Sequence, residues 1–265
     1  AKRRLLLFDY DGTLAPIRSR PEEAVPSHRL CELLRTLGTD AANRVVICSG
    51  RDSGTLEKWF GGLPVSLAAE HGAFYKDRGA WRCNIRPASW DPKLSALLEH
   101  FARKTPRSRI ERKQTALAWH YRESDAWLGT LRAQQLVNAL ISICTRQKLQ
   151  ILQGNKVIEI KSPDYNKGSE VNRLLSNKRY DFVIAMGDDT TDDDMFQALP
   201  LNAVTVKVGS ISEIANYNLP SQTDVLPFLQ AIIGRQKGSG INTNSTVKKR
   251  LASALDFFKD LLKTK

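Results

Sequence analysis

Short apolar runs that end in polar clusters constrain the fold of this chain more than any other feature of its sequence. Runs at residues 4–8, 45–48, 66–69 and 182–186 consist mostly of Leu, Val, Ile, Phe and Ala. Such runs are typical of strands that are covered on both faces in a parallel sheet. A further strand is expected at residues 203–208.

The segments between these runs favour helices. One helix is expected after Pro26, with Ser27 as its N-cap and Gly38 at its end. Its apolar residues recur at i, i+3, i+4 and i+7; they are Leu30, Leu33, Leu34 and Leu37. Strands that alternate with helices predict an α/β fold with a Rossmann-type parallel sheet and right-handed crossovers.

The pattern changes between residues 86 and 161. A helix is expected from Asp91 onward, polar and apolar residues alternate through 117–122, and a second helix is expected around 136–144. Two alternating runs on either side of a Gly154-Asn155 turn predict a hairpin. The sequence therefore predicts a compact α+β insertion within the parallel-sheet domain.

The predicted organisation has three parts. Residues 1–85 and 162–234 form a discontinuous core, residues 86–161 form an inserted α+β cap, and residues 235–265 hold a linker and a C-terminal helix. Gly, Ser and Asn are frequent in residues 234–245, as in flexible linkers. The last helix is amphipathic and basic; it is expected to dock on the core, and the alternative is that it binds a membrane or a partner. Its apolar stripe is Val247, Leu251, Leu255, Phe258 and Leu262.

Composition excludes several classes of protein. No apolar run approaches the roughly 18 residues of a membrane span, and no secretory signal pattern follows the first residues. We therefore expect a cytoplasmic protein with no membrane partner. The 4 cysteines have no paired spacing, which argues against a zinc site or a disulfide framework. Any bound metal would have oxygen ligands.

The chain is basic: 40 Lys and Arg against 28 Asp and Glu give a formal net charge of +12. This charge favours anionic partners. The basic residues are spread along the chain without the interleaved aromatic residues of a nucleic-acid platform, so no nucleic-acid partner is expected. The remaining explanations are a small phosphorylated substrate and a merely soluble surface.

Polar clusters follow three of the predicted strands. They lie at residues 9–13, which read Asp-Tyr-Asp-Gly-Thr, at 49–51, which read Ser-Gly-Arg, and at 187–192, which include Asp188 and Asp192. Ligands bind at the carboxyl ends of parallel strands. Several carboxylates gathered there repel one another unless a hard divalent cation such as Mg²⁺ lies between them. The alternative is that these aspartates form turns and cap helices.

In these motifs the sequence resembles the haloacid dehalogenase (HAD) superfamily of phosphatases. The matching motifs are Asp9-x-Asp11-Gly12-Thr13, Ser49, Lys167 and Gly187-Asp188-x-x-x-Asp192. Over residues 3–234 it is similar, more specifically, to trehalose-6-phosphate phosphatases. The motifs for this closer resemblance are Ser49-Gly50-Arg51, Ala69-Glu70-His71-Gly72, Glu111-x-Lys113, Trp119-His120-Tyr121-Arg122, Glu159-x-Lys161, Asn166-Lys167-Gly168 and Gly187-Asp188-Asp189-x-Thr191-Asp192-x-Asp194-Met195-Phe196.

The resemblance implies an HAD-like fold and hydrolysis of a phosphoric monoester. Asp9 would attack phosphorus to form an aspartyl-phosphate, and Asp11 would protonate the leaving sugar oxygen and then activate water. Ser49 would hydrogen-bond a phosphoryl oxygen, and Lys167 would stabilise charge in the transition state. A cation is unfavourable at a helix start, which favours this role of Lys167 over that of an ordinary surface lysine.

The implied cofactor is Mg²⁺. Asp9 and Asp188 would hold the ion with Asp192 in support, and Asp11 could add its backbone carbonyl. The ion would allow an anionic nucleophile to approach an anionic phosphate.

The resemblance places substrate recognition mainly in the cap. The residues that it implies as disaccharide contacts are Glu111, Lys113, Arg122, Lys156 and Glu159. Arg51 and His71 are further candidates from the core, although His71 could instead cap a loop. The alternative for the cap residues is that they form the solvent face of an exposed sheet.

The expected function is Mg²⁺-dependent hydrolysis of trehalose 6-phosphate to trehalose and phosphate, a step of trehalose biosynthesis. One alternative is an HAD phosphatase that acts on another sugar phosphate. Another is a non-catalytic module that supports a trehalose-phosphate synthase, and association with such a synthase is a candidate interaction in any case.

Overall fold

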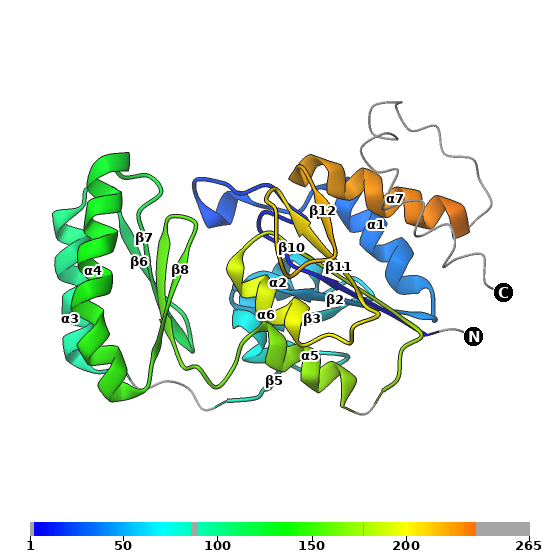
Figure 1. Cartoon of the computed structure of the whole chain (residues 1–265), viewed down its shortest axis with the longest axis horizontal. Coiled ribbons are helices and arrows are strands. Elements are labelled where there is room, and N and C mark those ends of the chain that lie inside the picture. The colour runs from blue at the N-terminus through cyan, green and yellow to red at the C-terminus, as the bar shows by residue number, and fades with distance from the viewer. Residues whose placement is uncertain (1–2, 86–89, 177, 237–265) are drawn as a thin grey trace.

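The computed structural model describes residues 3–85, 90–176 and 178–236, which form two sheets with flanking helices (Figure 1). Within these residues the larger sheet has eight strands in the order β12-β11-β10-β1-β2-β3-β4-β5, and the smaller has four in the order β6-β7-β9-β8. The strands of the larger sheet are β1 (Arg4–Phe8), β2 (Asn43–Cys48), β3 (Ser66–Ala69), β4 (Phe74–Lys76), β5 (Arg82–Cys83), β10 (Phe182–Gly187), β11 (Val204–Val208) and β12 (Tyr217–Leu219). Those of the smaller sheet are β6 (Arg109–Arg112), β7 (Ala116–His120), β8 (Gln150–Gly154) and β9 (Val157–Lys161).

The larger sheet is parallel from β12 to β3, which confirms the predicted α/β class. The prediction of a purely parallel sheet was incomplete, because β4 and β5 add to its edge in antiparallel pairing. The chain reverses direction at a short 3₁₀ turn, Glu70–Gly72, in which all three residues have positive φ. No apolar run marks β4, β5 or β12 in the sequence, and none of the three was predicted.

Both faces of the larger sheet are covered, as the continuous apolar strands indicated. Leu6 and Phe8 of β1 pack toward α1 (His28–Thr39), α2 (Ser53–Phe60) and α7 (Val225–Gln236). Leu5 and Leu7 of the same strand pack toward α5 (Lys167–Leu175) and α6 (Thr190–Gln197). The alternation of side chains along a strand therefore supplies a core on each side of the sheet.

Helix α1 begins as predicted and ends later than predicted. Ser27 caps it by accepting a hydrogen bond from the backbone N–H of Leu30. Gly38 is inside the helix, and the C-cap is Asp40. A Cβ at position 38 would lie 2.2 Å from the carbonyl oxygen of Pro64, so this glycine allows a close approach of backbone and does not end the helix.

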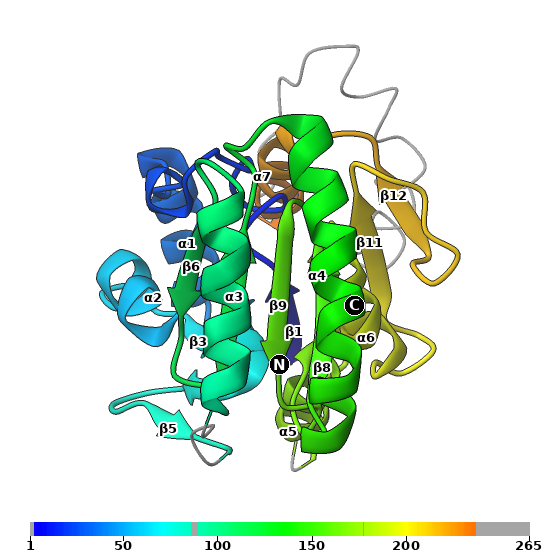
Figure 2. The same ribbon diagram turned by 90° about the vertical axis from the view of Figure 1, so that its left-hand side faces the viewer.

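The smaller sheet is covered on its outer face by α3 (Pro92–Lys104) and α4 (Ala126–Gln147), and its other face is turned toward the larger sheet (Figures 1 and 2). Leu117 and Trp119 pack beneath these helices. The intervening Ala118 is fully buried and His120 is mostly buried, so the second face of this sheet is not the solvent face that alternation alone would suggest. It forms one wall of a cavity.

The hairpin of β8 and β9 turns one residue later than predicted. Gly154 pairs with Val157, so the two residues of the turn are Asn155 and Lys156. Lys156 has a φ of 62°.

Helix α7 runs through Gln236, so the first three residues of the predicted linker, 234–236, are helical. The rest of that linker and the predicted amphipathic helix lie outside the described residues. Among the helices that the structure describes, none combines the length and the apolar character needed to cross a membrane.

Candidate active site

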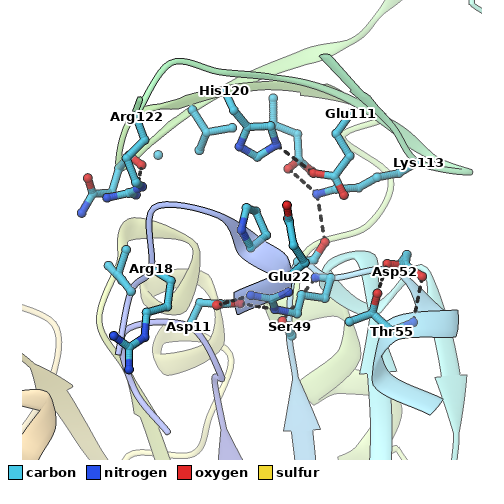
Figure 3. Close-up of a pocket in the computed structure, with 18 of the residues that line it drawn as sticks. Asp11, Arg18, Glu22, Ser49, Asp52, Thr55, Glu111, Lys113, His120 and Arg122 are labelled. Carbon is cyan, nitrogen blue, oxygen red and sulfur yellow. Dashed lines mark hydrogen bonds and ion pairs between the residues drawn. The ribbon is translucent and has the colours of Figure 1, made fainter. Parts of the chain in front are cut away.

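Polar residues at the ends of three adjacent strands meet at one edge of the larger sheet. Strand β1 lies between β10 and β2. Asp188 directly follows β10, Asp9 follows β1 and Ser49 follows β2. A cavity of about 830 Å³ opens between this edge and the smaller sheet (Figure 3). The predicted site residues in its lining are Asp9, Asp11, Ser49, Arg51, His71, Glu111, Lys113, Arg122, Glu159, Lys167 and Asp188. Neither Asp192 nor Lys156 lines the cavity, and Asp192 is fully buried.

A buried ammonium group joins two of the aspartates. Lys167 is the first residue of α5, and its Nζ lies 2.6 Å from Asp9 Oδ1 and 2.7 Å from Asp192 Oδ1. Burial alone would lower the pKa of Lys167, but Asp192 and Asp9 raise it well above its ordinary value. The lysine is therefore a fixed positive charge beside Asp9.

Backbone geometry holds Asp192 in place. Its Oδ2 accepts hydrogen bonds from the N–H groups of Asp188 at 2.9 Å and Asp189 at 3.1 Å. A Cβ at Gly187 would lie 2.1 Å from Asp192 Cγ, so the glycine makes room for this carboxylate. With Oδ1 bound to Lys167, both oxygens of Asp192 are engaged.

The aspartates fit a hard metal ion. Asp9, Asp188 and Asp192 each offer a carboxylate oxygen, and the three oxygens lie within 4.8 Å of one another. Burial raises the pKa of Asp9 to about 8 and of Asp188 to about 7, and neighbouring carboxylates add to both increases. An all-oxygen donor set of this kind suits Mg²⁺. The carboxylate of Asp11 is not part of this group.

Arg51 binds Asp11 instead. Its Nε and Nη2 donate to the two carboxylate oxygens of Asp11 at 2.7 and 2.6 Å, the bidentate geometry that favours Arg–carboxylate pairs. The guanidinium lies 4.5 Å from the ring centroid of Trp59 and 5.5 Å from that of Tyr10. Arg51 is thus held as a partner of Asp11. Ser49, which is also buried, accepts a hydrogen bond from the backbone N–H of Arg51.

Lys113 and Glu159 connect the smaller sheet to the larger one. Lys113 Nζ lies 2.9 Å from Glu159 Oε2 and donates to the carbonyl oxygen of Gly50 at 2.9 Å (Figure 3). His71 Nε2 lies 3.4 Å from the other carboxylate oxygen of Glu159. Burial alone would raise the pKa of Glu159, but Lys113 and His71 hold it well below its ordinary value. These residues place a buried ion pair next to the Ser49–Arg51 segment.

The remaining cap residues occupy different positions. Glu111 pairs with His120. His120 belongs to the Trp119-His120-Tyr121-Arg122 motif but is not among the predicted site residues. Arg122 donates to the carbonyl oxygen of Asn155 at the cavity rim. Lys156 instead places its ammonium 5.6 Å from the centroid of Tyr121, so its predicted role in substrate binding has no support from this arrangement.

A loop after β1 also contacts residues of the predicted cap. Arg20 Nε lies 3.0 Å from Glu123 Oε1, and Glu22 Oε2 lies 3.3 Å from Arg109 Nη1. The sequence offered no signal for these pairs, because each joins charges that lie roughly ninety to a hundred positions apart. Ile17 and Val25 on the same loop expose apolar side chains at the cavity.

Comparison with known proteins identifies the family. The sequence model described as trehalose-phosphatase matches residues 7–223. The chain belongs to the trehalose-phosphatase family. This confirms the family to which the sequence motifs pointed.

Two curated relatives place this family member in context. It is 43% identical over 225 residues to a trehalose-phosphatase of Zygosaccharomyces rouxii, an alignment that covers 75% of this chain and 25% of the relative. It is 41% identical over 235 residues to a bifunctional trehalose-6-phosphate synthase/phosphatase of Thermoproteus tenax, with 88% of this chain and 32% of the relative covered. The chain thus spans about a third or less of the length of these relatives.

Solved structures support the same family and fold. The C-terminal domain of Candida albicans trehalose-6-phosphate phosphatase matches with a TM-score of 0.82 and 35% identity, covering 88% of this chain and 93% of that one. A haloacid dehalogenase-like hydrolase from Bacteroides thetaiotaomicron matches with a TM-score of 0.61 at 16% identity, over 87% of this chain and all of the other, which shows the fold alone. The predicted HAD-like fold of this trehalose-phosphatase family member is confirmed.

Proposed function

We propose that this chain hydrolyses trehalose 6-phosphate to trehalose and inorganic phosphate, with Asp9 as nucleophile and Mg²⁺ as cofactor. The observation that carries the proposal is the buried contact between Lys167 and Asp9 at the base of a cavity that Glu111 and Glu159 line from the cap. A nucleophile with a fixed countercharge thus faces carboxylates that can accept hydrogen bonds from sugar hydroxyls. Family membership supports this choice of substrate.

The reaction would proceed in two steps. Lys167 engages Oδ1 of Asp9, which leaves Oδ2 to attack phosphorus while the bond to the sugar oxygen breaks. Asp11 would give its proton to that oxygen, and trehalose would leave. Water would then attack the aspartyl-phosphate while Asp11 takes a proton from it, which regenerates Asp9 and releases phosphate.

Asp11 must move or lose a partner during this cycle. As a carboxylate it is bound by both nitrogens of Arg51, a state suited to accepting a proton from water. To donate a proton to the sugar oxygen it must be protonated and part from Arg51. Arg51 would therefore act on Asp11 rather than on the sugar.

Asp9 and Asp188 would hold Mg²⁺, and Asp192 would orient the neighbouring backbone and Lys167. When bound, the ion would neutralise the carboxylates and withdraw charge from a phosphoryl oxygen. Ser49 would hydrogen-bond another phosphoryl oxygen, and the fixed charge of Lys167 would stabilise the transition state.

We propose the division into a core, residues 1–85 and 162–234, and a cap, residues 86–161, that reads the sugar. The two sheets and the cavity between them support this division. In the cap, Glu111, Lys113, Glu159 and Arg122 would contact the disaccharide, and His71 would contribute from the core.

Association with a trehalose-6-phosphate synthase is proposed from the bifunctional name of one relative. A cytoplasmic location is likewise a proposal.

Phosphate release from trehalose 6-phosphate, glucose 6-phosphate and p-nitrophenyl phosphate tests the activity and the substrate. We expect the first to be hydrolysed with the highest kcat/KM. Asp9→Asn should abolish release of phosphate from all three while circular dichroism stays unchanged. Asp164→Asn, an exposed charge outside the cavity, is the matched control. A preference for another sugar phosphate would replace the proposed substrate, and residual activity of Asp9→Asn would refute the nucleophile.

Calorimetric titration of Mg²⁺ into chelator-treated protein tests the metal site independently of turnover. The parent should bind the ion, and Asp188→Asn should weaken binding at least tenfold. Equal affinity in the parent and the variant would rule out Asp188 as a ligand.

A further inference from the structure

A histidine outside the predicted site lies against one of the proposed sugar-binding carboxylates. His120 Nε2 is 2.7 Å from Glu111 Oε2, and both side chains line the cap side of the cavity (Figure 3). The side chain of His120 is 19% exposed and that of Glu111 is 37% exposed. No hydrogen bond within the described residues engages the other carboxylate oxygen of Glu111. That oxygen is available to a ligand.

The register of the smaller sheet creates this contact. Glu111 pairs with Ala118, and His120 pairs with Arg109, so Glu111 and His120 are diagonal neighbours on one face of the sheet. Ala118 presents only a methyl group between Glu111 on one side and Glu159 on the other. The imidazole can therefore reach sideways to the carboxylate.

The strand that carries His120 is firmly anchored. Its neighbour Trp119 is fully buried on the opposite face, donates from its indole nitrogen to Ser108, and stacks on Tyr121 with ring centroids 4.9 Å apart. A side chain on a strand fixed in this way is held more accurately than one on a loop. His120 is thus a rigid support for a flexible partner.

Lys113, whose charge also acts on Glu111, does not perform the same task. Its ammonium is engaged by Glu159 and the carbonyl oxygen of Gly50. Within the described residues, the hydrogen bond that orients Glu111 comes from His120 alone.

We propose that His120 is a positioning residue for sugar recognition: by holding Oε2 of Glu111, it keeps Oε1 directed into the cavity as an acceptor for a sugar hydroxyl. The inference rests on the proposed function. A glutamate side chain has three rotatable torsions, and fixing them before binding removes an entropic penalty at the moment of binding. Loss of the His120 side chain would therefore raise KM for the sugar phosphate and leave the rate of the chemical step unchanged.

The test measures kcat and KM for trehalose 6-phosphate and for p-nitrophenyl phosphate, which lacks the sugar. We compare His120→Ala, His120→Gln, Glu111→Ala and the double variant His120→Ala/Glu111→Ala. His100→Ala on α3, outside the cavity, is the matched control. Thermal unfolding of each variant shows whether it is folded.

His120→Ala should raise KM for trehalose 6-phosphate about tenfold, the range expected for a lost hydrogen bond to a charged group, and leave kcat unchanged. His120→Gln should stay within about twofold of the parent, because the amide nitrogen can replace Nε2 as donor. The double variant should be no worse than Glu111→Ala. Kinetics of the two single His120 variants on the aryl phosphate should be unchanged, and Glu111→Ala should lose far less on this ester than on trehalose 6-phosphate.

A His120→Ala variant that keeps the parental KM, or that loses activity equally on both esters, would overturn the inference. So would additive losses in the double variant. A parent that hydrolyses neither ester would refute the proposed function and this inference with it, whereas an active parent with an unaffected His120→Ala would refute the inference alone.

Discussion

The backbone of Gly12 lies directly against the carboxylate of Asp188. A Cβ at position 12 would lie 2.1 Å from Asp188 Oδ2, and the φ of Gly12 is 88°, in the left-handed region that favours glycine. The turn after β1 can therefore bring Asp9 and Asp188 to one place only if residue 12 has no side chain.

Gly12→Ala is expected to lower kcat for phosphate ester hydrolysis at least 100-fold, because the methyl group displaces Asp188 and a shift of about 1 Å at a reacting centre has effects of this size. Strained backbone should add a loss of stability of about 1–2 kcal/mol. Gly79→Ala provides the control: its φ is 76°, but no atom lies within 4 Å of the added Cβ. If both variants keep full activity, contact with Asp188 does not shape the site.

Two ion pairs join the loop after β1 to residues of the proposed cap. The loop supplies the cation in the pair of Arg20 with Glu123 and the anion in the pair of Glu22 with Arg109. Because both are exposed, we expect them to contribute little to overall stability. Because they join the two sides of the cavity, we expect them to affect substrate binding. Arg20→Glu should raise KM for trehalose 6-phosphate several-fold, an effect that high salt reduces, and Arg20→Glu/Glu123→Arg should restore it. Reversal of Arg112, whose pair with Glu99 lies within the cap, is the control. Failure of the double variant to recover would exclude this coupling.

Glu70 joins the larger sheet to the two residues that precede β7, Gln114 and Thr115. Its Oε2 accepts from the backbone N–H of Thr115 at 2.8 Å and from the Thr115 hydroxyl, and its Oε1 accepts from the N–H of Gln114. Glu70→Ala would leave the buried N–H and hydroxyl of Thr115 without this acceptor, and we expect the free energy of unfolding to fall by about 2–3 kcal/mol. Glu70→Gln, which keeps an acceptor, should lose less. Urea unfolding and hydrogen exchange at the Thr115 amide measure both effects; unchanged exchange in Glu70→Ala would contradict the prediction.

Lys161 should make stability depend on alkaline pH. It is 1% exposed and donates to the carbonyl oxygens of Ser162 and Tyr165, and burial lowers its pKa from 10.5 to about 8. Between pH 8 and 10.5 the unfolded chain binds a proton here that the folded chain has lost, so this group makes the folded state more stable as pH rises. The full difference is about 3 kcal/mol.

Lys161→Met removes this dependence. Urea unfolding at pH 8, 9 and 10 should show that the stability of the parent, relative to that of Lys161→Met, increases with pH. Parallel curves for the two proteins would show that Lys161 titrates alike in the folded and unfolded chains.

Local patterns in the sequence were sufficient for much of the fold. The runs at β1, β2 and β10 predicted buried parallel strands, and the residues that follow them were expected at one edge of the sheet, where Asp9, Ser49 and Asp188 lie. Burial on both faces leaves a direct signature in hydrophobicity, which explains this success. Strands β4 and β5 are too short to leave such a signature.

The sequence by itself determined the class of the fold, the strand ends that carry the carboxylates, and the family. Only the tertiary structure decided which partner each charged side chain has: Arg51 binds Asp11, Lys113 reaches Gly50, and His120 holds Glu111. The physical reason is that periodicity reports which face of an element is buried, whereas a pair contact depends on the register of strands and on how two sheets face each other. Those relationships arise between distant segments, and no local pattern encodes them.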